Sequence, residues 1–274
     1  MAGRTQREGH LAQVRLPHRA LGQSPFGLAA TSSAVVLALF VLWLLAGLAR
    51  LALVGPGRRP ATAILVPLGL SLASASLATL LALLLGVPAA WWLARSRWGG
   101  RGWVGLLLDL PLVLSPVALG TALLLFLQFP PGSLLERLIG VTFRFPGVVL
   151  AQFTVVLALV VRTAAAAFAQ ASWELERHAI TYGAARWFVL TQVTLPASKP
   201  GLLAAAVLAF GRALGEFGAT VTVAGTIPGR TETLATGVYM ALSAGELRLA
   251  AQLALVLVLA AALALAAVRY WEKR

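Results

Sequence analysis

The sequence of 274 residues contains no cysteine, which excludes disulfide bonds, thiolate metal sites and cysteine nucleophiles. Histidine is scarce: His10, His18 and His178 are scattered, and no two of them have the spacing of metal ligands. The nucleotide-binding patterns GxxxxGKS and GxxxxGKT are missing, so the chain does not bind ATP in that way. From these absences we predict no catalytic residue, no metal site and no cofactor bound by this chain, and therefore not an enzyme.

Charge is scarce too. Charged residues make up 11% of the sequence and hydrophobic residues 59%, whereas about a quarter of a typical soluble domain is charged. The formal net charge of +13 would suggest nucleic acid in a soluble protein, but no basic stripe with interleaved aromatic residues is present. Arginines at the ends of membrane spans instead set topology and contact anionic lipid. We therefore expect a membrane protein whose partners include lipid but not nucleic acid.

Six apolar segments are long enough to cross a bilayer, which takes about 20 residues of helix. They cover residues 32–54, 66–94, 104–128, 146–168, 201–224 and 249–268. The first is too long for the core of a signal peptide, and no A-x-A-like cleavage site follows it. The fold class is therefore predicted to be all-α: a polytopic membrane helix bundle of about six transmembrane helices.

The domain organisation follows from these segments. Residues 1–30 are basic and polar and are expected to form a disordered tail, and residues 31–60 the first transmembrane helix and its loop. Residues 61–268 form the main transmembrane domain, and residues 269–274 a second tail. Placing both tails in the cytoplasm puts most Arg and Lys residues on the inner side, as the positive-inside rule requires. Arg50, with two further arginines in the next loop, opposes this locally, so the status of the first span stays open.

Small and hydroxyl residues such as Ser71 and Ser74 recur along the second span, where they favour close helix packing in lipid. The third span carries Pro111, Ser115 and Pro116, which predict a kink or a partly unwound segment. Broken backbone at membrane depth is tolerated where it is packed in protein or faces a cavity. Both a translocation path and plain helix packing are consistent with this region.

The longest polar interruption between spans is residues 171–200, here called the docking loop. Glu176 lies near the start of a predicted helix, where negative charge suits the helix dipole. Gly183 is expected to end or tighten this helix, and Pro196 and Pro200 to stop a second amphipathic helix before the next span. The loop would form a knob for a soluble partner, although an interfacial helix resting on lipid explains the periodicity equally well.

The fifth span contains two ionisable residues, Arg212 and Glu216, four positions apart and able to pair on one helical face. Such groups at membrane depth are costly and usually face a bundle interior or an aqueous path. A structural pair that locks helices and a charge that attracts an anion both remain open. Gly211, Gly215 and Gly218 suit close packing or a hinge.

Asp109 and Arg162 lie within other spans. Asp109 is expected to cap or snorkel near the cytoplasmic end of its helix, and Arg162 to reach the interface through its long stem. Neither has a second acid or histidine at helical spacing, so no proton relay is predicted.

The spacing within the docking loop resembles the coupling-loop signature of ABC importer permeases. That signature reads Glu-Ala-Ala, three residues, Gly, nine residues, Ile, one residue, Leu-Pro. The matching residues here are Ala179, Gly183, Val193 (a conservative substitute), Leu195 and Pro196. The resemblance implies that this loop docks as a cytoplasmic coupling helix into a cleft on a separate ATPase, which uses ATP-Mg to move the spans.

Two positions depart from the signature. Arg177 stands where the family has Glu, and His178 where it has the first Ala. Glu176, one residue out of register, is the candidate to supply the missing carboxylate. These differences concern the charge contacts with the ATPase, so all three residues are assigned to the coupling group.

Further motifs resemble the molybdate/sulfate branch of these permeases over approximately residues 60–268. The matching segments are residues 109–116, 145–147, 211–220 and 224–234. Residues 161–164 and 230–234 favour molybdate over sulfate, while a tungstate permease would have the same features. The resemblance therefore implies a fold like that of type I ABC importer permeases and an oxyanion, most closely molybdate, as the transported substrate.

The same resemblance implies partners: a second copy of this chain, two ATPase subunits, and an extracytoplasmic binding protein that delivers the oxyanion. Arg230, Thr231 and Thr233 are candidates to contact that binding protein, or they form a simple turn between spans. The membrane would be the cytoplasmic membrane of a bacterium or archaeon. The alternative of a secondary transporter driven by an ion gradient predicts paired intramembrane carboxylates in an internal repeat, whereas Glu216 alone lies deep in a predicted span.

Overall fold

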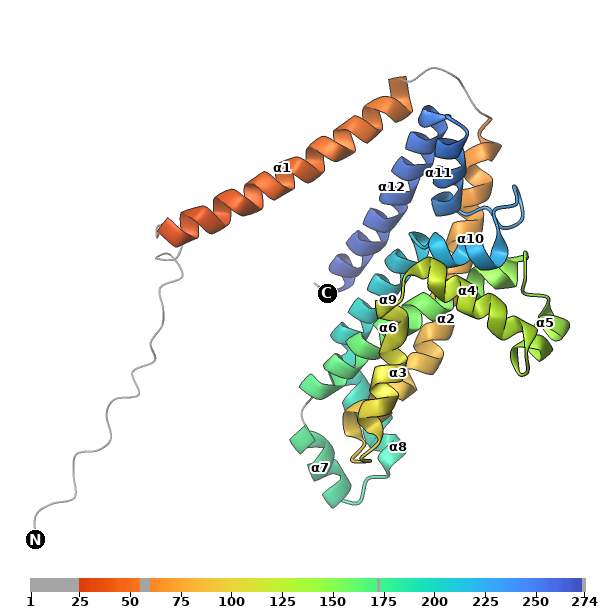
Figure 1. Ribbon diagram of the computed structural model, residues 1–274. Coiled ribbons are helices and arrows are strands. Elements are labelled where there is room, and N and C mark those ends of the chain that lie inside the picture. Colours follow the sequence, from red (N-terminus) through yellow and green to blue (C-terminus); the bar gives the residue numbers. More distant parts are fainter. Residues whose placement is uncertain (1–24, 55–59, 172, 273–274) are drawn as a thin grey trace, which may run out of the picture. The chain divides into compact units, whose positions relative to one another are not determined.

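The computed structural model describes residues 25–54, 60–171 and 173–272 (Figure 1), and every regular element in these ranges is helical. This confirms the predicted all-α fold class. The elements are α1 (Pro25–Val54), α2 (Thr62–Arg95), α3 (Arg101–Val113), α4 (Pro116–Gln128), α5 (Gly132–Ile139), α6 (Phe145–Gln170), α7 (Trp173–Thr181), α8 (Arg186–Val189), a π-helical turn (Leu190–Thr194), α9 (Leu195–Leu214), α10 (Gly218–Ala224), α11 (Leu234–Ser243) and α12 (Leu247–Glu272).

The chain divides into two compact units, residues 1–47 and 48–274. The first unit contains most of α1, which begins at Pro25, so residues 25–30 are helical where a disordered tail was expected. The rest of that predicted tail lies outside the described residues. The second unit contains the remaining elements, and α12 continues to Glu272 through most of the predicted second tail.

Five helical segments in the described residues are long and apolar enough to cross a membrane: Thr31–Val54, Thr62–Arg95, Phe145–Gln170, Trp187–Leu214 and Leu247–Ala267. The third predicted span is a sixth candidate in two pieces, because α3 and α4 meet at a bend of 115°. The predicted kink is thus confirmed. Ser115 caps α4 by accepting a hydrogen bond from the Ala118 amide at 3.2 Å, and Pro116 occupies the first helical turn.

The fifth predicted span is wrong at both ends. Pro196 and Pro200 do not stop a helix, because α9 begins at Leu195 and contains both of them. Pro196 lies in the first turn, where the missing N–H of proline is tolerated, whereas Pro200 lies inside the helix. The helix then ends at Leu214 and not at residue 224, and Gly215 is its C-cap. Apolar sequence resumes directly after Glu216, which is why hydropathy alone does not reveal this break.

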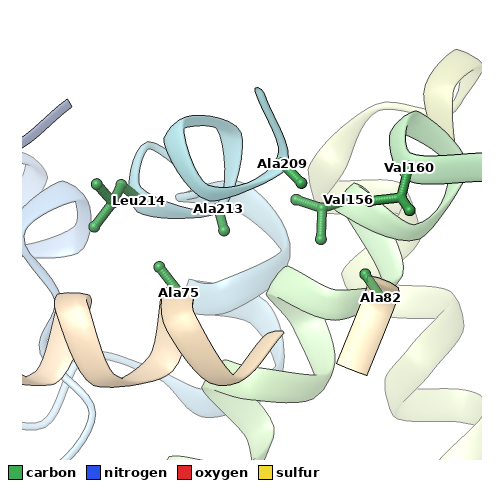
Figure 2. Close-up of a cluster of buried hydrophobic side chains, with 7 residues drawn as sticks. All are labelled: Ala75, Ala82, Val156, Val160, Ala209, Ala213 and Leu214. Atoms are coloured by element: carbon green, nitrogen blue, oxygen red, sulfur yellow. The ribbon is translucent and has the colours of Figure 1, made fainter. Parts of the chain in front are cut away.

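The core of the second unit is a bundle of α2, α6 and α9, which pack against one another. Small side chains line the contact (Figure 2): Ala75 and Ala82 from α2, Val156 and Val160 from α6, and Ala209, Ala213 and Leu214 from α9. Ser71 and Ser74 are buried in α2, in agreement with the predicted packing role of its small residues.

The two ends of this bundle carry different elements. At one end of α2, the Ser71 hydroxyl accepts a hydrogen bond from the Leu234 amide, the first residue of α11, at 2.7 Å. At its other end Arg95 contacts Glu176 of α7. Figure 1 shows α7 and α8 below the bundle and α11 at the opposite end. The docking loop therefore lies at the end of the bundle remote from the 225–233 loop.

Candidate functional site

The docking loop begins as a short helix, α7, that ends at a glycine. Gly183 has a φ of +86°, a left-handed conformation that residues with a Cβ rarely adopt. The terminal hydrogen bonds run from the Tyr182 amide to the His178 carbonyl and from the Gly183 amide to the Ile180 carbonyl, both at 3.0 Å. A Cβ at Gly183 would meet no atom within 4 Å. Glycine is therefore required here by backbone conformation and not by lack of space, and the prediction that it ends the helix is confirmed.

The outer surface of the loop combines cationic and aromatic side chains. Arg177 and His178 are exposed on α7, and Tyr182 just beyond it is 90% exposed. Trp187 and Phe188 on α8 are exposed as well. Contiguous exposed apolar groups are typical of surfaces that contact another protein or a membrane.

The motif residues of the loop fall into two groups. Ala179, Val193 and Leu195 are partly buried, whereas Pro196 is exposed. The spacing of the motif therefore places its aliphatic residues toward the inside of the loop. They shape the loop, and its exposed surface is formed by Arg177, His178, Tyr182, Trp187 and Phe188.

Glu176 differs from its neighbours because it faces the helix bundle. Its carboxylate is almost fully buried and accepts hydrogen bonds from the Arg95 Nε atom at 3.0 and 3.2 Å. The Thr194 hydroxyl donates to the same carboxylate at 3.0 Å. This placement contradicts the expectation that Glu176 supplies a partner-facing carboxylate in place of the one missing at position 177.

Sequence reasoning missed Arg95 and Thr194 as members of this site. Arg95 reads as one of several basic residues at the end of a span, and it is 81 positions from Glu176. Thr194 occupies the variable position between Val193 and Leu195 of the motif. The burial of Thr194 and its lack of a capping role are visible only in the structure, so the sequence held no signal for it.

The predicted pair at the end of α9 is present. Arg212 Nη1 lies 2.6 Å from Glu216 Oε2, although Glu216 lies beyond the end of the helix. The Glu216 side chain is buried, and its second oxygen accepts a hydrogen bond from the Ala219 amide at 2.9 Å in the first turn of α10. Glu216 therefore joins α9 to α10, while the Arg212 guanidinium stays partly exposed.

Ser115, Pro116 and Gly218 come together where α4 crosses α10. The crossing is tight on both helices. A Cβ at Gly218 would lie 2.8 Å from the Pro116 Cβ atom, and a Cβ at Gly120 would lie 2.7 Å from the Thr222 Cβ atom. Gly215, by contrast, is exposed and has open space around it. Close packing explains Gly218, whereas Gly215 serves the break between α9 and α10.

A second ion pair was not foreseen. The Arg162 guanidinium on α6 donates two hydrogen bonds to the Asp109 carboxylate on α3. The Asp109 side chain is largely buried and the Arg162 side chain largely exposed. The expectation that the two residues act separately, by capping and by snorkelling, is therefore wrong. Their separation of 53 positions in the sequence concealed the contact.

The loop after α10 contains the residues predicted either to contact a binding protein or to form a turn. The Thr231 hydroxyl accepts a hydrogen bond from the Ile227 amide at 3.0 Å, and Thr233 caps α11 through a reciprocal pair of bonds with Thr236. Both threonines are buried, whereas Arg230 is exposed. The geometry favours the turn for the two threonines and leaves Arg230 available for contact.

Residues 82–274 match the protein family described as binding-protein-dependent transport system inner membrane component. The molybdenum transport system permease protein ModB of Escherichia coli (strain K12) is 43% identical over 113 residues, which are 39% of this chain and 49% of that protein. The chain thus spans about half the length of that relative. ModB of Azotobacter vinelandii is 37% identical over 180 residues, which are 64% of this chain and 79% of that protein.

Solved structures show the same fold. A bacterial alginate ABC transporter, in complex with an alginate pentasaccharide-bound periplasmic protein, contains a chain that superposes with a TM-score of 0.70 at 17% sequence identity. The superposition covers 90% of this chain and 93% of that one. At this identity the likeness concerns the arrangement of the helices.

Proposed function

Because the chain belongs to the family of binding-protein-dependent transport system inner membrane components, we propose that it is the permease subunit of an ATP-driven oxyanion importer. We further propose that the oxyanion is molybdate. The E. coli and A. vinelandii relatives are molybdenum transport system permease proteins by name. The motifs at residues 161–164 and 230–234 support the same substrate. Tungstate and sulfate are the alternative oxyanions.

The observation that carries the proposal is the geometry of the docking loop. It lies at one end of the bundle, its glycine turn has left-handed backbone, and it leads directly into the membrane helix Trp187–Leu214. A soluble protein that binds and moves α7 would therefore also displace the membrane-spanning helix that follows it. The motor is a separate ATPase that binds ATP-Mg, and each of two copies of this chain engages one such subunit.

The exposed residues of the docking loop indicate the chemistry of the ATPase cleft that binds it. Arg177 and His178 provide positive charge, and Tyr182 and Trp187 provide exposed aromatic surface. Since Glu176 is buried against Arg95, its charge is neutralised within this subunit. The complementary cleft on the ATPase would carry a carboxylate opposite Arg177 and an apolar floor beneath the aromatic rings.

The translocation path is assigned to the region where α9 breaks and α4 crosses α10. Arg212 gives this region a partly exposed cation, but Glu216 neutralises most of its field. Weak attraction is what a path requires, because an anion must leave as readily as it enters. The pairing also argues against the secondary-transport alternative, since Glu216 is held by Arg212 and by a backbone amide.

On the opposite face, Arg230 is the candidate contact for an extracytoplasmic binding protein. With the docking loop on the cytoplasmic side, the 225–233 loop lies outside, at the far end of α2. Selectivity among oxyanions would then lie largely in the binding protein, and the permease supplies alternating access.

The test is uptake in proteoliposomes that contain this chain, its partner ATPase and the binding protein. The binding protein is added outside the vesicles, and ATP is enclosed inside, on the side of the docking loop. We expect molybdate uptake that requires this ATP and that excess tungstate inhibits. Sulfate in the same excess should compete poorly if the molybdate assignment is correct. Uptake that ignores ATP and follows a proton or sodium gradient would exclude the importer function.

A further inference from the structure

The buried Glu176 carboxylate connects the points where the docking loop leaves the bundle and returns to it. Arg95 at the end of α2 donates to it from Nε and from Nη2, the latter at 2.5 Å. The same Nη2 atom donates to the carbonyl of Ala171, the C-cap of α6, at 3.4 Å. Thr194, in the π-helical turn that precedes α9, donates to the carboxylate from the other side. One carboxylate thus links α2, α6, α7 and the start of α9.

Burial makes this link specific. The side chains of Arg95 and Glu176 are 13% and 7% exposed, so water replaces few of their hydrogen bonds. In such surroundings a paired charge is tolerated, whereas a single remaining charge is strongly unfavourable. The pair therefore persists when the helices around it move together.

Other contacts between α7 and α2 are weak by comparison. The main neighbours of α7 in the fold are α8 and the π-helical turn. A groove of about 360 Å³ separates the end of α2 from the loop, and Trp91, Ile180 and Leu190 are among the residues that line it. Because this space is not filled by side chains of the subunit, packing alone does not fix α7 to α2.

We infer that Arg95, Glu176 and Thr194 form a joint that transmits a displacement of α7 to α2 and α9. The inference rests on the proposed function, because an ATPase must supply that displacement. Arg95 and Thr194 are positioning residues: they contact neither the oxyanion nor ATP. The π-helical turn at the joint is consistent with a functional role, since such turns often occur at functional sites.

The absence of cysteine allows a direct test by site-directed spin labelling. One label at Thr181→Cys, the exposed last residue of α7, reports on the docking loop, and another at exposed Arg97→Cys reports on the segment just after the end of α2. Distances between the two copies are measured with the ATPase bound, before and after trapping with ATP and vanadate. In the parent chain we expect both labels to shift. In Arg95→Gln we expect the label at position 181 to shift and the label at position 97 to stay.

Transport provides the second readout. We expect Arg95→Gln to lower the number of molybdate ions imported per ATP about tenfold, within the usual range of coupling between sites, while ATP hydrolysis continues. Arg97→Cys is the matched control, because it removes an exposed arginine two positions away and should transport normally. The charge reversal Arg95→Glu with Glu176→Arg should recover most of the coupling, which a purely local loss of folding would not permit.

The outcomes separate the joint from the proposed function. If the parent chain shows no ATP-dependent shift at position 181 and no uptake, both are overturned. If the parent responds and Arg95→Gln retains the shift at position 97 or normal uptake per ATP, the joint alone is overturned. If Arg95→Gln fails to copurify with the ATPase, the reversed pair decides: an assembled complex that transports supports the joint, and one that does not transport overturns it.

Discussion

Gly218 at the start of α10 packs directly onto Pro116 at the start of α4, and a Cβ at position 218 would lie 2.8 Å from the Pro116 Cβ atom. The Val117 backbone nitrogen is equally close, at 3.1 Å. A larger residue at 218 must therefore separate two helix starts and not merely move a side chain. The region assigned to the translocation path is thus held together by backbone contact.

Replacing Gly218 tests this contact. We expect Gly218→Val to destabilise the protein by about 1–3 kcal/mol, the usual cost of overpacking, and to lower uptake by altering the α4–α10 crossing. Thermal unfolding in detergent and uptake in proteoliposomes measure the two effects. Gly215→Ala is the matched control, since position 215 has open space and should tolerate a methyl group. Equal effects at both positions would contradict the packing role of Gly218.

Gly183 is required for its backbone conformation, whereas Gly218 is required for lack of space. Because the φ of Gly183 is +86° and no atom lies near, only conformation opposes a side chain there. We expect Gly183→Val to strain the turn by roughly 1–2 kcal/mol and to uncouple ATP hydrolysis from uptake, without affecting membrane insertion. Gly183→Asp should uncouple by placing a charge in the docking surface. Gly183→Asn should be milder, because asparagine enters the left-handed region more readily. Normal coupling in all three variants would show that the loop is not the coupling element.

The Asp109–Arg162 pair predicts a non-additive result. Arg162→Leu leaves the largely buried Asp109 carboxylate without its partner, at a cost of about 1–3 kcal/mol, whereas Asp109→Leu leaves a largely exposed guanidinium and should cost less. The double variant Asp109→Leu with Arg162→Leu leaves no unpaired charge, so we expect it to be at least as stable as either single variant. Thermal unfolding in detergent of the parent, the two single variants and the double variant completes this double-mutant cycle. Additive losses would mean that the two residues do not interact energetically.

Glu232 predicts a dependence on pH. It lies half-buried beside Pro67, Leu249 and Leu253 in a groove on the side of the 225–233 loop, and desolvation raises the pKa of its carboxyl group above 4.5. The folded protein therefore binds this proton more tightly than the unfolded chain, so folding is favoured as the pH falls through the raised pKa. Above that pKa the charged carboxylate opposes folding.

We accordingly expect Glu232→Gln to be more stable than the parent at pH 8. This gain should shrink as the pH falls through the folded-state pKa and vanish below 4.5, where the parent is protonated in both states. Unfolding temperatures between pH 4 and pH 8 measure the difference. A gain that is constant across this range would rule out titration of Glu232 as its cause.

Much of the fold could be predicted because lipid imposes long apolar segments. The spans around α2, α6 and α12 were placed within several residues, and the prolines on either side of Leu114 indicated the break between α3 and α4. The end of α9 was misplaced because apolar sequence resumes directly after Glu216, while the backbone turns at residues 215–217. Pro196 was misread as a stop because proline favours a helix start as much as it opposes a helix interior.

The candidate site was predictable only where its residues are close in the sequence. Arg212 and Glu216 are one helical turn apart, and their pairing followed from that spacing. Arg95 with Glu176, and Asp109 with Arg162, meet only after α2, α3, α6 and α7 are assembled. Charge alone gave no reason to choose these partners among the other ionisable residues of the chain.

The alanines at the centre of the bundle have a consequence for motion. Ala75, Ala82, Ala209 and Ala213 present short, unbranched side chains to the neighbouring helices. Surfaces of this kind interdigitate little, so one helix can slide along another by a small distance without forcing side chains to change rotamer. Shear of packed helices is a recognised way for proteins to switch between states. The alanine faces of α2 and α9 are thus suited to a small shear, whereas Val156 and Val160 give the α6 face more relief.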